Sequence, residues 1–226
     1  MTADLLRPTG VQHSARPAVV VVDDHSLVSD TVTLALRERG IEVTAVEPAA
    51  FISRADDEAP PFGLVLLDLD LGSGRDGSEL VPRLRRAGWQ VLLFTASRNE
   101  TRIAMAVAAG ALGWVSKSSS FDALVQAVVR AAAGQPLLPA VERARFVALA
   151  RTAGQAARAE RERWQRLTPR EREVVSRIVA GRRPAVIAKE FVVSVATVRS
   201  QIRSILAKLE VSSQLEVAAL VRRHER

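Results

Sequence analysis

The chain of 226 residues is 48% apolar and 25% charged, so it is long enough for one large domain or two small ones with ordinary cores. The absence of cysteine excludes disulfides and thiolate metal sites and fits a reducing compartment. The net charge of +7 is uneven: residues 1–139 hold 13 Lys and Arg against 16 Asp and Glu, whereas residues 140–226 hold 19 against 9. An acidic half followed by a basic half predicts two domains, the second suited to a polyanion.

The N-terminal segment, residues 1–16, has no periodicity and contains Pro8 and Gly10, so we expect a flexible arm. Its early acid and proline stand where a signal peptide needs a long apolar stretch, and no later segment is apolar enough to span a bilayer. The sequence therefore predicts a cytoplasmic protein without a membrane partner.

Strand and helix patterns alternate over residues 17–136. Short apolar runs indicate strands at 18–22, 41–46, 62–67, 91–94 and 112–116. Helical stretches, most of them closed by a glycine, are indicated at 27–39, 48–54, 76–87, 99–109 and 121–133. Five strands that alternate with five helices predict an α/β doubly wound domain with a five-stranded parallel sheet.

Polar side chains end four of these apolar runs. Asp23 and Asp24 follow the first run, Asp68 the third, Thr95 the fourth and Lys117 the fifth. Ligands of parallel sheets gather at the carboxyl ends of the strands, so we expect these side chains to share one crevice. Three carboxylates, a hydroxyl and an ammonium suit a divalent metal beside an aspartate that accepts a phosphoryl group.

The chemistry suggests a role for each carboxylate. Asp68 would be the phosphoacceptor, and because its charge repels a phosphoryl donor, a hard cation has to bridge donor and acceptor oxygens. Asp23 and Asp24 would bind this cation, Mg²⁺, together with Asp68 itself. The backbone carbonyl of Asp70 is a plausible further ligand.

The other two polar residues would bind the phosphoryl group, Lys117 through its charge and Thr95 through its hydroxyl. Each residue also has an ordinary structural interpretation. Asp and Thr often cap helices, loop lysines are often solvated, and Ser97 with Glu100 resembles a capping box. The placement of all these groups at the ends of different runs favours a site.

Four fragments stand out at the ends of the runs: Val-Val-Asp23-Asp24-His, Leu-Leu-Asp68-Leu-Asp, Phe-Thr95-Ala and Gly-Trp114-Val-Ser-Lys117. Together they make residues 17–136 resemble the receiver domain of two-component response regulators, which has a flavodoxin-like fold. The resemblance implies that phosphorylation draws the hydroxyl residue inward and that an aromatic residue three before the lysine moves with it. Trp114 occupies that position, although an aromatic in a strand is as commonly part of the core.

Two residues depart from the receiver pattern. Gly72 stands four residues after Asp68, where the family often has proline, and Asp70 adds an acid where many relatives carry asparagine. The extra charge either strengthens metal binding or opposes an incoming phosphoryl group. A regulator whose atypical receiver is never phosphorylated is therefore an alternative.

The basic half begins with residues 137–165, which are rich in Ala, Arg and Glu and have no strand signal. We expect a solvated helical linker. A helical arm that contributes to a dimer interface is the alternative.

A small all-α four-helix domain is expected over residues 166–226. Thr168 and Glu171 form a capping-box pattern around Pro169, which predicts a first helix to about residue 180. Further helices are expected at 184–190, from the cap Ser194 to about residue 209, and from residue 212 or 213 onward. The tight turn before the third helix predicts a helix-turn-helix.

The third helix has two faces. An apolar stripe for the core is made by Val195, Val198, Ile202, Ile205, Leu206 and Leu209. Arg199, Ser200 and Arg203 lie opposite, beside two alanines, so this face fits a major groove. We expect four further residues to contact phosphates from the rim: Thr197, Arg182, Arg183 and Lys208. A merely solvated basic face is the alternative.

Three fragments carry a second resemblance: Leu167-Thr-Pro-Arg-Glu-Arg-Glu-Val, Ser194-Val-Ala-Thr197-Val198-Arg199-Ser-Gln-Ile and Lys208-Leu-Glu-Val-Ser. They closely resemble the LuxR-type four-helix DNA-binding domain, and joined to a receiver this is similar to the NarL/FixJ subfamily of response regulators. The resemblance implies a bacterial transcription regulator that a sensor histidine kinase phosphorylates and that dimerises on paired half-sites of double-stranded DNA. Glu210 departs from the pattern where glycine is common, and a left-handed conformation there would cost about 1 kcal/mol.

We therefore expect a DNA-binding transcriptional response regulator, not an enzyme, that phosphorylation of Asp68 switches toward an open, dimeric state. The alternative from a different class is a haloacid-dehalogenase-type phosphatase with Asp68 as nucleophile and Asp70 as acid. That motif normally follows the first strand, whereas here it ends the third. A phosphatase would also leave the basic half without a purpose.

Overall fold

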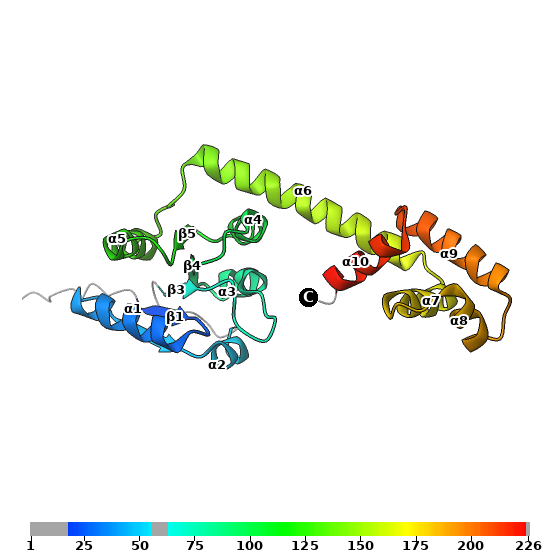
Figure 1. Ribbon diagram of the computed structural model, residues 1–226. Coiled ribbons are helices and arrows are strands. Elements are labelled where there is room, and N and C mark those ends of the chain that lie inside the picture. Colours follow the sequence, from blue (N-terminus) through cyan, green and yellow to red (C-terminus); the bar gives the residue numbers. More distant parts are fainter. Residues whose placement is uncertain (1–17, 56–62, 225–226) are drawn as a thin grey trace, which may run out of the picture. The chain divides into compact units, whose positions relative to one another are not determined.

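The computed structural model describes residues 18–55 and 63–224 (Figure 1). The arm expected at residues 1–16 lies outside these ranges. The chain divides into two compact units, Met1–Ala150 and Arg151–Arg226. Among the described residues, no helix has the length and apolar character needed to cross a membrane.

The first unit is built on a sheet of five parallel strands in the order β2-β1-β3-β4-β5. Their bounds are β1 Val19–Val22, β2 Val43–Val46, β3 Leu64–Leu67, β4 Gln90–Thr95 and β5 Gly113–Ser116. The runs of Val and Leu form central strands because helices cover both faces of the sheet, and every residue of β3 is buried. This arrangement confirms the predicted doubly wound fold.

Helices lie on both faces of this sheet (Figure 1). One face is covered by α1 (Ser26–Glu38) and α5 (Phe121–Ala132), the other by α2 (Pro48–Ser53), α3 (Val81–Arg86) and α4 (Glu100–Ala108). Because side chains alternate along a strand, β3 sends Leu64 and Leu66 into the first core and Val65 and Leu67 into the second. The two cores hold all five strand ends at one edge of the sheet.

The helix predicted at residues 76–87 is divided in two. A short 3-10 helix, Gly77–Leu80, comes first, capped by Asp76, which accepts the Ser78 N–H at 2.8 Å. The α-helical part, α3, begins only at Val81. Pro82 explains the division, because it has no N–H to donate to the carbonyl oxygen four residues earlier.

The capping box of Ser97 and Glu100 is not formed. Asn99 caps α4 instead, because its side-chain oxygen accepts the N–H groups of Thr101 and Arg102 at 3.1 and 3.2 Å. The cap therefore lies two residues nearer to the helix than the pattern indicated.

The boundary between the two units falls within a long helix, α6 (Ala140–Gln165). Its first turns are docked on the first unit: Phe146 is 2% exposed in the core formed with α3 and α4. Arg143 also donates to the carbonyl oxygens of Ala111 and Leu112 at 3.2 and 2.7 Å. The expectation of a solvated linker is thus wrong for these first turns, since an aromatic side chain and a guanidinium group anchor them.

The second unit contains four further helices: α7 (Pro169–Val179), α8 (Pro184–Glu190), α9 (Val195–Leu209) and α10 (Gln214–His224). They enclose a core that includes Val174, Ile187, Val198, Ile205 and Val217. Val195, which was expected in the apolar stripe, is 37% exposed because it is the first residue of α9. The other stripe residues are buried or half-buried, as predicted.

The two caps predicted in this unit are present: the Ser194 hydroxyl accepts the Thr197 N–H at 3.0 Å, and Thr168 and Glu171 form the capping box. The Thr168 N–H donates to the Glu171 carboxylate at 2.8 Å, and the Glu171 N–H donates to the Thr168 hydroxyl at 3.2 Å. Glu210 ends α9 in the left-handed conformation with φ of 57°. Its carboxylate lies 2.8 Å from the Arg163 guanidinium and 3.6 Å from that of Arg166, and these ion pairs offset part of the backbone cost.

Candidate functional site

Strand register brings the predicted polar residues of the first unit to one edge of the sheet. Val22, which precedes Asp23, pairs with Leu67, which precedes Asp68, between β1 and β3. In the same way, Thr95 of β4 pairs with Ser116 of β5, which precedes Lys117. The Lys117 N–H also donates to the Thr95 carbonyl oxygen at 3.0 Å. Parallel pairing alone therefore aligns the four strand ends.

An ammonium group joins two of these strand ends. Lys117 Nζ lies 2.5 Å from Oδ2 of Asp23 and 2.5 Å from Oδ2 of Asp68, and both carboxylates are buried. Burial opposes the charge on Lys117, but its hydrogen bonds and charge interactions with Asp23 and Asp68 outweigh this effect and raise its pKa. Lys117 therefore stays positive beside the proposed phosphoacceptor.

The carboxylates form a cluster that includes a histidine. Ligand atoms of Asp23, Asp24, His25 and Asp68 all lie within 4.8 Å of one another. His25 Nδ1 is 2.8 Å from Oδ1 of Asp24, and the His25 N–H donates to Oδ1 of Asp23 at 2.9 Å. Carboxylate oxygens at this spacing fit Mg²⁺, which is usually bound by one or two carboxylates and several waters. Sequence reasoning missed His25, although it directly follows Asp24.

Gly72 makes room beside this cluster. Its φ is 70°, and a Cβ atom at this position would lie 3.0 Å from Oδ2 of Asp24. Proline, with its fixed negative φ, cannot adopt this backbone conformation. The departure from the receiver pattern thus reflects a loop that approaches the Asp24 carboxylate closely.

Asp70 is placed differently from the other acids. Its Oδ1 atom accepts a hydrogen bond from Nη1 of Arg102 at 2.7 Å, and its carboxylate is not part of the cluster. The Arg102 guanidinium therefore balances the charge of the Asp70 carboxylate. The sequence pattern did not indicate this ion pair. Metal binding through the Asp70 carbonyl stays a prediction.

The two residues of the predicted switch lie on neighbouring strands. Thr95 is fully buried, and its hydroxyl accepts the Ser97 N–H at 3.1 Å. Trp114 is half-buried and packs against the core shared by α3 and α4. Their roles in a switch stay predictions.

The second unit presents the predicted basic face on α9. Arg199, Ser200 and Arg203 are all exposed, as are the small Ala196 and Ala207 beside them. Neither arginine side chain forms a hydrogen bond or ion pair with any residue that the structure describes. Both guanidinium groups are therefore available to an anionic partner.

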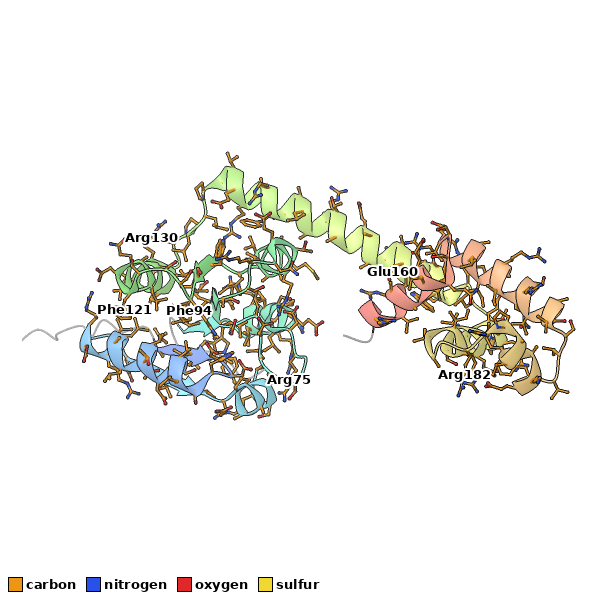
Figure 2. All side chains as sticks on the ribbon, viewed as in Figure 1. Arg75, Phe94, Phe121, Arg130, Glu160 and Arg182 are labelled. Atoms are coloured by element: carbon orange, nitrogen blue, oxygen red, sulfur yellow. The ribbon has the colours of Figure 1, made fainter. Side chains whose placement is uncertain are left out.

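Three of the expected rim residues are also exposed. Arg182, labelled in Figure 2, lies 3.9 Å from Glu190 and its side chain is 57% exposed. Arg183 precedes α8, and the Thr197 hydroxyl lies 2.8 Å from that of Ser194. Their contacts with phosphate stay predictions.

Lys208, the fourth expected rim residue, is engaged within the second unit. Its Nζ lies 2.9 and 2.7 Å from the two carboxylate oxygens of Glu171 on α7. Lys208 follows Arg199 by nine residues, which is about two and a half helical turns and places it on the opposite face of α9. We therefore correct its assignment from DNA contact to an ion pair that ties α9 to α7.

Glu171 is the buried partner in this ion pair, with 6% of its surface exposed. Burial favours its neutral form, but Lys208, the Thr168 N–H and the Ser204 hydroxyl stabilise the carboxylate and lower its pKa to about 2. A depressed pKa contributes stability that is complete above the ordinary pKa and is lost as the pH falls toward the depressed one.

The second unit is accordingly expected to lose about 2 kcal/mol of this contribution between pH 7 and pH 3. Urea unfolding of the full chain would measure the loss through Trp164, which packs against this core, with Trp89 and Trp114 changed to phenylalanine. Glu171→Gln should remove that part of the pH dependence, whereas Glu173→Gln, an exposed neighbour, should keep it. Equal pH profiles for wild type and Glu171→Gln would contradict the assignment.

Family models match both units. Residues 19–129 match the response regulator receiver domain, and residues 165–221 match the bacterial regulatory proteins of the luxR family. The two matches lie in the units that carry the acidic cluster and the basic face, respectively.

The chain is also similar to known proteins over most of its length. The chain is 29% identical to the nitrate/nitrite response regulator protein NarL of Escherichia coli over 90% of this chain and 94% of the relative. It is 30% identical to the transcriptional activator protein ExaE of Pseudomonas putida over 89% of this chain and 94% of the relative. Among solved structures, the response regulator StyR is 26% identical and matches 92% of this chain and 100% of that chain with a TM-score of 0.46.

Proposed function

The chain belongs to the NarL/FixJ subfamily of two-component response regulators, and from this premise we propose that phosphorylation of Asp68 controls its binding to double-stranded DNA. The observation that carries the proposal is the position of Lys117, whose ammonium joins Asp23 and Asp68 at the edge of an acidic cluster. A buried carboxylate with a fixed cation and nearby metal ligands is the arrangement that an aspartyl phosphoacceptor needs.

Each residue of the acidic site has its own role in phosphoryl transfer. An oxygen of Asp68 attacks phosphorus while the bond from phosphorus to the donor breaks, which leaves an acyl phosphate on Asp68. The Leu69 N–H, which donates to Oδ1 of Asp68 at 2.6 Å, orients the carboxylate. Lys117 offsets charge on the phosphoryl oxygens. Mg²⁺ bound by Asp23, Asp24 and Asp68 would supply further positive charge.

The partners follow from the two units. We propose that a sensor histidine kinase donates the phosphoryl group and that Thr95 and Trp114 respond to it. Arg199, Ser200 and Arg203 then contact base edges and phosphates in a major groove, because long cations beside small side chains can enter it. Paired half-sites would be occupied by a homodimer.

Phosphorylation is expected to tighten DNA binding by about tenfold or more, as a modest population shift would produce. Duplexes selected from a random pool by the phosphorylated chain would be titrated with wild type in the presence of Mg²⁺, with and without acetyl phosphate. Omission of Mg²⁺ serves as the control. Equal affinities with and without acetyl phosphate would instead support the alternative of a phosphorylation-independent regulator.

A further inference from the structure

Arg102, on α4, spans the loop that follows the phosphoacceptor. Its Nε lies 2.8 Å from Oδ2 of Asp76, its Nη1 lies 2.7 Å from Oδ1 of Asp70, and its Nη2 donates to the Leu69 carbonyl oxygen at 2.5 Å. Only 23% of the Arg102 side chain is exposed. All three guanidinium nitrogens therefore contact one short segment of the chain.

That segment, residues 69–77, folds back on itself. Asp70 and Asp76 form an antiparallel bridge, and the Gly77 N–H donates to the Leu69 carbonyl oxygen at 2.8 Å. The tip of this loop carries three residues in succession with positive φ, from Gly72 to Gly74. The loop begins directly after Asp68. Its tip lies beside the acidic cluster, because Gly72 approaches the Asp24 carboxylate.

The charges around Arg102 stabilise one another. Burial opposes the charge of Arg102, but hydrogen bonds and charge interactions with Asp76 and Asp70 outweigh it and raise its pKa. Burial likewise opposes ionisation of Asp76, yet Arg102 and Ser78 lower its pKa. The network therefore places the Arg102 guanidinium against both the Asp70 and the Asp76 carboxylate.

We propose that Arg102 is a positioning residue of the metal site, which holds the Asp70 carboxylate at α4 and so keeps its charge from the cluster of Asp23, Asp24 and Asp68. The inference rests on the proposed function. A fourth carboxylate two residues after the phosphoacceptor would attract Mg²⁺ but repel an anionic phosphoryl donor. Arg102 thus lowers the affinity for Mg²⁺ and makes it easier for an anionic donor to reach Asp68.

A double-mutant cycle on the full chain tests this inference, with Mg²⁺ binding measured by titration calorimetry. Arg102→Gln should bind Mg²⁺ about fivefold more tightly, because it releases the Asp70 carboxylate toward the cluster. Asp70→Asn, which keeps the backbone carbonyl, should change the affinity by less than about twofold while Arg102 is present. The variant with both changes should return to within about twofold of wild type.

Arg75→Gln is the matched control. Arg75 lies in the same loop and is exposed (Figure 2), and its side chain has no hydrogen bond or ion pair with the part of the chain that the structure describes. Its substitution removes the same charge and should leave Mg²⁺ affinity within about twofold.

Two results would overturn the inference while wild type binds Mg²⁺ normally. Additive effects of Arg102→Gln and Asp70→Asn would show that only total charge matters, and weaker binding by Arg102→Gln that Asp70→Asn does not restore would show a merely structural role. Wild type that binds no Mg²⁺ at all would overturn the proposed function, and this inference with it.

Discussion

Asp68→Asn is expected to remove phosphorylation completely. After incubation with Mg²⁺ and acetyl phosphate, intact mass should show one phosphoryl group on wild type and none on the variant. The change replaces a nucleophilic carboxylate oxygen by an amide, whose nitrogen and oxygen are both much poorer nucleophiles.

The variant should nevertheless keep its fold. Asparagine has nearly the same shape as aspartate, and its one side-chain oxygen can accept a hydrogen bond either from Lys117 or from the Leu69 N–H. Lys117 also retains its ion pair with Asp23, so the buried ammonium is not left alone. A loss of the adduct would therefore report on chemistry, provided that the melting temperature of the variant stays close to that of wild type.

Asp122→Asn is the matched control for this experiment. Asp122 lies on α5 with 75% of its side chain exposed, pairs with Arg39 and is not part of the acidic cluster. It should acquire the same single adduct as wild type. An adduct that persists on Asp68→Asn would show that another residue is the acceptor, whereas no adduct on any variant would favour the atypical receiver.

The double variant Arg199→Ala/Arg203→Ala is expected to lose about 100-fold or more in affinity for the selected duplex. A base-contacting arginine contributes roughly 1–3 kcal/mol of discrimination, and a phosphate contact adds a salt-dependent part. Neither side chain has a partner among the described residues, so their removal should leave the free protein intact. The cost therefore falls on the complex.

Fluorescence anisotropy at several salt concentrations would measure this loss and its cause. If the arginines contact bases, the variant should lose most of its preference for the selected duplex over a random one; if they contact phosphates, the salt slope should flatten. Arg158→Ala/Arg161→Ala on α6 removes the same charge from exposed positions and should bind nearly as wild type does. Equal losses in both double variants would mean that net charge, and not the α9 face, determines binding.

The acidic site could be predicted largely from the sequence, because its main residues depend on topology alone. Each apolar run is long enough only for one buried strand, and parallel strands end at the same edge, so Asp23, Asp68, Thr95 and Lys117 gather at one edge of the sheet. The two faces of α9 follow from helical periodicity in the same way. That periodicity also places Lys208 on the face opposite Arg199, a signal that the sequence interpretation overlooked.

Other features were decided only by tertiary packing. Arg102 and Asp70 are 32 residues apart, and Lys208 and Glu171 are 37 residues apart. No periodic pattern relates such positions, because their pairing depends on how two helices or a helix and a loop dock, and on which rotamers that docking permits. The sequence thus determined the order of elements, the edge at which the carboxylates gather and the exposed arginines. The tertiary structure alone decided which charges neutralise one another, since that choice requires distances of a few ångströms across separate elements.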